Sequence, residues 1–137
     1  MTDHQWKYRA RLVEIIDGDT MDFIVDLGFN ITRKMRIRLK NVDTAETYGV
    51  EKGSEEYQKG MEHKQYAAKW FNGVSDSTDA QWPLYLVTYK DSTGKYGRYL
   101  ARVEARESDT VTLLEGTDVA PDLTDALVNE YPEVLSE

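Results

Sequence analysis

The chain has 137 residues, no cysteine and a formal net charge of −8. This length fits one domain with a core of its own, and the lack of cysteine excludes a disulfide framework and a thiolate metal site. The sequence holds no apolar run of membrane-spanning length, and its first residues lack a signal-peptide pattern, so we expect an intracellular protein.

The negative charge is concentrated at the C-terminal end. Residues 107–137 contain nine acidic residues and no Lys or Arg, whereas residues 1–106 contain 16 acids and 17 bases. We therefore expect one domain over residues 1–137 with an acidic tail from about residue 107. Local basic strips in the rest of the chain remain able to bind an anion.

Three segments rich in apolar and β-branched residues open the chain and predict a meander of three strands. They cover residues 8–16, 21–27 and 34–40. Asp17-Gly18-Asp19-Thr20 and Gly28-Phe29-Asn30 are the turns between them. In the third strand the cations alternate with apolar residues, so one face is cationic and the other faces a core.

The rest of the chain predicts a helix followed by two more strands. Ser54 is a plausible N-cap, and the helical spacing of apolar residues stops at Asn72-Gly73. Strands are predicted over residues 83–90 and 99–106, with a long turn between them and residues 111–114 extending the second as a hairpin. A last short helix opens at Asp122 or Thr124. This element order is that of an OB-fold five-stranded barrel, so the fold class is mainly β with helices (α+β).

The acidic segment Asp43-Thr44-Ala45-Glu46 follows the third strand, which carries Arg38. Its oxygen groups suit a hard cation such as Ca²⁺ or Mg²⁺, and the neighbouring guanidinium suits a phosphate. The alternative is a charged edge strand followed by an ordinary acidic turn.

Two further segments have both a functional and a structural interpretation. Asp17-Gly18-Asp19-Thr20 places a carboxylate at a tight turn, although Asp and Gly are also common turn residues. Lys95-Tyr96-Gly97-Arg98 offers two cations and an aromatic ring to a phosphate, or is a solvated turn. The histidines His4 and His63 form no zinc or triad pattern and are expected at the surface.

Together these segments resemble the staphylococcal nuclease (thermonuclease) family. The likeness rests on Asp17-Gly18-Asp19-Thr20, on Arg38 with residues 42–47, and on Lys95-Tyr96-Gly97-Arg98, and it spans about residues 8–128. The family fold is the OB barrel that the strand order also predicts. The chain departs from the family pattern at Ala45, where the family usually has proline.

The resemblance implies a metal site and a base. Asp19, Asp43 and the backbone carbonyl of Thr44 correspond to the ligands of a single Ca²⁺, and the ligand types alone also allow Mg²⁺ or Mn²⁺. Glu46 corresponds to the general base, or to the residue that positions the attacking water.

The resemblance also implies how a substrate is held. Arg38 and Arg98 correspond to the guanidinium groups on the scissile phosphate, and Lys95 and Tyr96 to contacts with a neighbouring phosphate. The expected activity is Ca²⁺-dependent hydrolysis of phosphodiester bonds in DNA and RNA with low sequence specificity, because phosphate contacts carry no sequence information.

Single-stranded nucleic acid is the expected substrate of the open groove, and a monomer is expected. The family's base-stacking tyrosines near the C-terminus have no counterpart here. A viral or mobile-element origin would account for an acidic, intracellular member. The alternative function is a non-catalytic OB-fold module that binds nucleic acid or protein.

Overall fold

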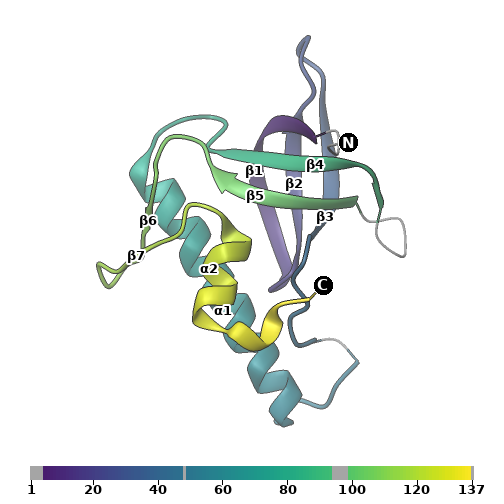
Figure 1. Cartoon of the computed structure of the whole chain (residues 1–137), viewed down its shortest axis with the longest axis vertical. Helices are drawn as coiled ribbons and strands as arrows, with labels where there is room; N and C mark the ends of the chain where they lie inside the picture. Colours follow the sequence, from purple (N-terminus) through teal and green to yellow (C-terminus); the bar gives the residue numbers. More distant parts are fainter. Residues whose placement is uncertain (1–4, 48, 94–98, 137) are drawn as a thin grey trace.

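Five strands close a β-barrel, and two helices pack together on one side of it (Figure 1). The computed structural model describes residues 5–47, 49–93 and 99–136. The elements are β1 (Gln5–Asp17), β2 (Thr20–Asp26), β3 (Thr32–Leu39), α1 (Glu55–Ser77), β4 (Leu84–Thr93), β5 (Tyr99–Ala105), β6 (Val111–Thr112), β7 (Asp118–Val119), α2 (Leu123–Glu130) and the 3₁₀ helix η2 (Pro132–Val134). The predicted α+β class with an OB-like barrel is confirmed.

The strand order β1-β2-β3-β5-β4 brings distant segments to one end of the barrel. β1, β2 and β3 form an antiparallel meander, β3 pairs with β5 in parallel, and β4 closes the barrel by pairing with both β5 and β1. Thr20 lies opposite Arg38, and Arg38 lies opposite Leu100. The β1–β2 turn, the end of β3 and the start of β5 therefore meet at this end.

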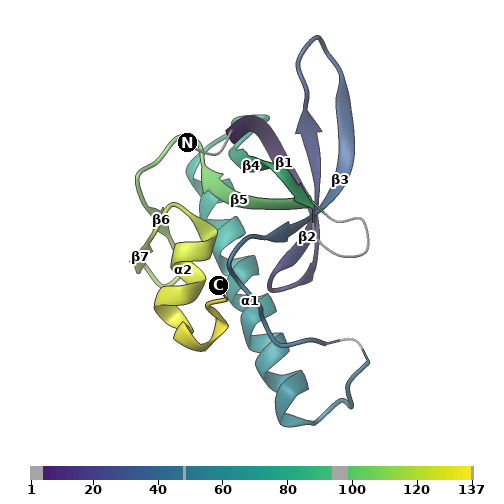
Figure 2. The same cartoon turned by 45° about the vertical axis from the view of Figure 1, so that its right-hand side comes forward.

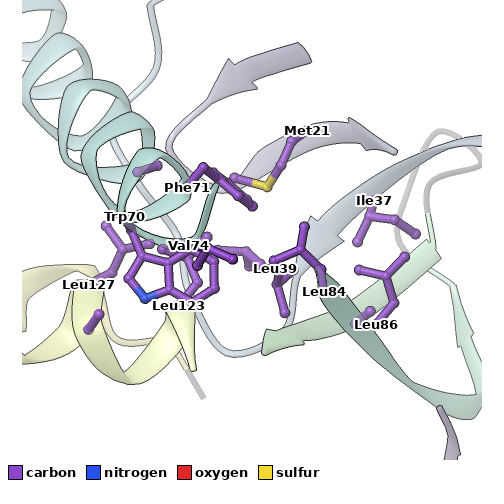
Figure 3. Close-up of a cluster of buried hydrophobic side chains, with 14 of the residues drawn as sticks. Met21, Ile37, Leu39, Trp70, Phe71, Val74, Leu84, Leu86, Leu123 and Leu127 are labelled. Atoms are coloured by element: carbon purple, nitrogen blue, oxygen red, sulfur yellow. The ribbon is translucent and has the colours of Figure 1, made fainter. Parts of the chain in front are cut away.

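The core lies between the barrel and the two helices. Met21 on β2 and Ile37 and Leu39 on β3 belong to this core together with Trp70 and Phe71 of α1. Figure 3 shows Phe71 beside Met21, whereas Ile37 lies farther from the helix. All five side chains are almost fully buried. Burial of a large apolar side chain stabilises a fold by roughly 1.5–3 kcal/mol, so this cluster fixes the helices against the barrel.

The β2–β3 hairpin projects away from the barrel (Figure 2). Its turn contains three consecutive residues in the left-handed backbone region: Gly28, Phe29 and Asn30, with φ of 87°, 54° and 61°.

Helix α1 continues beyond the predicted stop at Asn72-Gly73 and ends at Ser77. A Cβ atom at Gly73 would lie 2.6 Å from the carbonyl oxygen of Thr112. The glycine therefore allows β6 to approach the helix closely, and the helix does not end there.

No helix in the described part of the chain is both long and apolar enough to cross a membrane.

The predicted extension of the fifth strand over residues 111–114 is wrong. β6 pairs with β7 in a separate two-stranded sheet and not with β5.

The acidic segment beyond residue 107 contributes buried side chains to the core, among them Leu123 and Leu127. Its helix α2 begins after Asp122, whose side chain accepts a hydrogen bond from the backbone N–H of Asp125 at 3.2 Å.

Candidate active site

One guanidinium nitrogen joins two of the predicted functional carboxylates. Arg38 Nη2 donates to Asp19 Oδ2 at 3.2 Å and to Asp43 Oδ1 at 3.0 Å. The register of β2 and β3 explains this contact, because it sets the β1–β2 turn beside the end of β3. The Arg38 side chain is 25% exposed and that of Asp43 is 70% exposed, so the cluster opens to solvent on the Asp43 side.

Asp19 is the buried member of this cluster. Its carboxylate also accepts hydrogen bonds from Thr20 Oγ1 at 2.9 Å and from the backbone N–H of Thr44 at 3.1 Å. Its backbone carbonyl accepts from the N–H of Leu39 at 2.8 Å. The Thr20 hydroxyl, the Thr44 N–H and Arg38 together fix the carboxylate in one orientation.

The loop that carries Asp43 is held from the C-terminal end of the chain. The N–H of Asp43 donates to the carbonyl of Val134 at 2.8 Å, and Val42 forms a β-bridge with Leu135. At the far end of the loop, Thr47 Oγ1 donates to Asp17 Oδ1 at 2.7 Å. Asp17 thus connects the β1–β2 turn to this loop, which is a structural contact.

Helix α1 holds the middle of the same loop. The backbone N–H of Ala45 donates to His63 Nδ1 at 3.2 Å. A Cβ atom at Gly60 would lie 2.8 Å from the carbonyl oxygen of Glu46 and 2.9 Å from that of Ala45, so only glycine lets the loop come this close. A proline in place of Ala45 could not donate at this position, because proline has no N–H.

The prediction that His63 lies at the surface is wrong, since the residue is only 2% exposed. His4 falls outside the described residues. The sequence contained a signal for His63: together with Gly60, Ala67 and Trp70 it continues the three- and four-residue spacing of the buried helix face. The charged neighbours Glu62 and Lys64 obscured this pattern.

The remaining predicted site residues are Glu46, Lys95, Tyr96 and Arg98, and the structure describes only the first of them. Glu46 is exposed, and its side chain makes no hydrogen bond or ion pair within the described part of the chain. Lys95, Tyr96 and Arg98 lie outside the described residues. Their roles remain predictions, although β5 begins directly after them at Tyr99, opposite Ile37.

The chemistry of the donor groups fits a hard divalent cation. The two carboxylates of Asp19 and Asp43 are close enough to share one Arg38 nitrogen, and the backbone of Thr44 contacts the Asp19 carboxylate through its N–H. The Oγ1 atom of Thr44 is buried and has no hydrogen-bond partner among the described residues. No group of three or more His, Cys, Asp or Glu side chains is arranged for a metal in the residues described. A cation here would therefore also need backbone oxygens and water, as Ca²⁺ and Mg²⁺ commonly use.

No protein-family model matches the chain, and a search of curated proteins finds no match.

Proposed function

We propose that this chain is a divalent-cation-dependent nuclease of the staphylococcal nuclease type, hydrolysing phosphodiester bonds in DNA and RNA. The observation that carries the proposal is the contact of one Arg38 nitrogen with both Asp19 and Asp43 at one end of the barrel. This contact supports the proposal because it puts two proposed cation ligands next to a guanidinium that could bind phosphate, a pairing that suits phosphodiester hydrolysis.

Arg38 and a divalent cation compete for the same carboxylate oxygens. Asp19 and Asp43 would hold the cation, and the Arg38 guanidinium would then be released to bind phosphate oxygens in a bidentate manner. The bound cation would supply charge neutralisation and polarise the phosphoryl oxygen. Ca²⁺ is the first choice, and Mg²⁺ and Mn²⁺ are the alternatives to be tested.

Glu46 is the proposed general base. Its exposed carboxylate is not occupied by a described donor, so it can accept a proton from the attacking water. The resulting hydroxyl group bonds to phosphorus, and the bond from phosphorus to the leaving oxygen breaks. The leaving oxygen keeps the electron pair and takes a proton from solvent. Arg98 is proposed to stabilise the same phosphate, and Lys95 and Tyr96 to hold its neighbour.

A non-catalytic nucleic-acid-binding module is the second candidate. The observation that favours it is that the Arg38 guanidinium already pairs with both Asp19 and Asp43, the two proposed cation ligands. A binding module should retain its affinity for nucleic acid in excess chelator, whereas the activity of the nuclease should disappear there.

The test is cleavage of heat-denatured DNA by the wild type and Glu46→Gln, each with Ca²⁺ and with excess chelator. Loss of the base is expected to slow cleavage on the order of 10²–10⁴-fold. Glu115→Gln is the matched control, because Glu115 is an exposed glutamate in the turn between β6 and β7. Cleavage that survives chelator and Glu46→Gln would contradict the proposal, and intact DNA with every divalent ion would support the binding module.

A further inference from the structure

The tip of the β2–β3 hairpin presents three large apolar side chains to solvent. Phe29 is 97% exposed, and Leu27 and Ile31 on either side of it are also exposed. The hairpin extends well beyond the barrel (Figure 2), so these side chains have no part in the core. An exposed apolar group of this kind is typical of a binding surface.

The backbone of the tip holds Phe29 in the left-handed region, which costs conformational free energy. Leu27 N–H donates to the carbonyl of Ile31 at 2.8 Å, Ile31 N–H to that of Gly28 at 2.9 Å, and Gly28 N–H to Asp26 Oδ1 at 2.9 Å. This closed turn places Phe29 at φ 54°, where a residue with a side chain loses roughly 1–2 kcal/mol. Strained residues of this kind cluster at binding and active sites.

The tip is cationic although the protein is acidic. Arg33 and Lys34 follow the tip and are exposed, with no ion pair to any described residue. The carboxylate nearest the tip, Asp26, is already paired with Arg9. An exposed apolar ring close in sequence to two exposed cations is complementary to a partner that has both flat apolar groups and negative charge.

Strand β3 connects this tip to the candidate active site. Lys34, Arg36 and Arg38 lie on the same face of β3, and alternate residues of a strand repeat at about 6.6–6.8 Å. This spacing is comparable to that of successive phosphates on an extended single strand of nucleic acid. Arg36 pairs with Asp22 at 2.8 Å but half of its side chain remains exposed, and Arg38 ends the row beside Asp19 and Asp43.

We propose that the hairpin tip and this face of β3 bind the single-stranded nucleic acid substrate beside the active site. Phe29 stacks on a base, and Lys34 contacts a phosphate. This inference rests on the proposed nuclease function, which it extends by assigning the substrate a path along β3. The row of cations leading to the acid pair favours a phosphate chain over a membrane or a second copy of the chain, because neither of those requires charges aligned with the site.

The test measures binding of a fluorescently labelled oligothymidylate to the Glu46→Gln protein with Ca²⁺, by fluorescence anisotropy at several salt concentrations. Phe29→Leu is expected to weaken binding about five- to tenfold because it loses the stacking surface, and Phe29→Tyr to retain it. Lys34→Ala is expected to lower the slope of log K against log salt by about 0.7, the value for one phosphate contact. Leu114→Ala is the matched control, since Leu114 is 94% exposed but lies in the turn between β6 and β7.

The outcomes separate this inference from the nuclease proposal. If the wild type cleaves DNA while Phe29→Leu binds as tightly as its parent, the inference is overturned and the nuclease stands. If the wild type cleaves nothing but Phe29→Leu weakens binding, the hairpin is a nucleic-acid surface and the nuclease proposal fails. If Phe29→Leu alters only binding to phosphatidylserine vesicles or only the sedimentation coefficient, the partner is a membrane or a second copy, and the inference is overturned.

Discussion

His63 Nδ1 accepts a hydrogen bond from the backbone N–H of Ala45 at 3.2 Å, across 18 residues of sequence. The contact ties the buried face of α1 to the loop between Asp43 and Glu46. The same imidazole lies edge-on to Tyr131, with ring centroids 4.8 Å apart, and its Nε2 is 3.6 Å from Glu133 Oε2. One side chain therefore couples the loop, the helix and the C-terminal end of the chain.

We expect His63→Leu to destabilise the protein by about 1–3 kcal/mol, because it leaves the N–H of Ala45 without an acceptor. His63→Asn should recover part of this loss, since Asn Oδ1 stands close to the position of Nδ1. Urea unfolding measures both variants. Equal destabilisation by Leu and Asn would show that packing of the ring, and not the hydrogen bond, is what matters.

Gly60→Ala should destabilise the protein, although alanine favours a helix by about 1 kcal/mol over glycine. The new methyl group would press on the carbonyl oxygens of Ala45 and Glu46, and overpacking of this kind costs about 1–3 kcal/mol. Gly73→Ala is the control, because its methyl group would meet Thr112 on β6 instead. Thermal unfolding should show a loss for both variants, and cleavage assays a loss of activity for Gly60→Ala alone. A more stable Gly60→Ala protein would show that the loop moves aside freely.

Arg38→Ala tests the competition between the guanidinium and a cation. In chelator we expect a loss of about 1–3 kcal/mol, because the buried carboxylate of Asp19 loses a charged hydrogen-bond donor. Excess Ca²⁺ should raise the melting temperature of Arg38→Ala more than that of the wild type, since the cation no longer competes with Arg38. The variant should nevertheless be inactive. The absence of any Ca²⁺-dependent shift in both proteins would argue against a cation at this site.

Stability should fall in acid partly through Asp22. The hydrogen bond from Arg36 holds the pKa of the Asp22 carboxyl below its ordinary value of 3.8. The ionised carboxylate therefore stabilises the folded state above pH 3.8, and this contribution is lost as the pH falls through the lower pKa of the folded state. On acidification, the free energy of unfolding of Asp22→Asn should fall less than that of the wild type. The difference between the two losses should be at most about 1 kcal/mol, because the Arg36 side chain is half exposed and solvent screens the pair. Urea unfolding at a series of pH values measures the difference, and parallel profiles would contradict it.

The sequence identified the strands and their order because alternation of polar and apolar residues is a local signal. It also placed Arg38 beside Asp43, which are only five residues apart at the end of a strand. The boundaries of α1 and of the last strands were less well predicted. Asn72-Gly73 predicts a helix stop from local residue types, whereas the close approach of Gly73 to Thr112 cannot be read from neighbouring residues.

By itself, then, the sequence determined the OB-like barrel and the set of residue types available for phosphate and metal chemistry. Only the tertiary structure decided which of them meet. Asp19 reaches Arg38 because the pairing of β2 with β3 sets Thr20 opposite it, and His63 reaches Ala45 because the core packs α1 against the barrel. Such contacts depend on strand register and on burial across the whole chain, which no short stretch of sequence specifies.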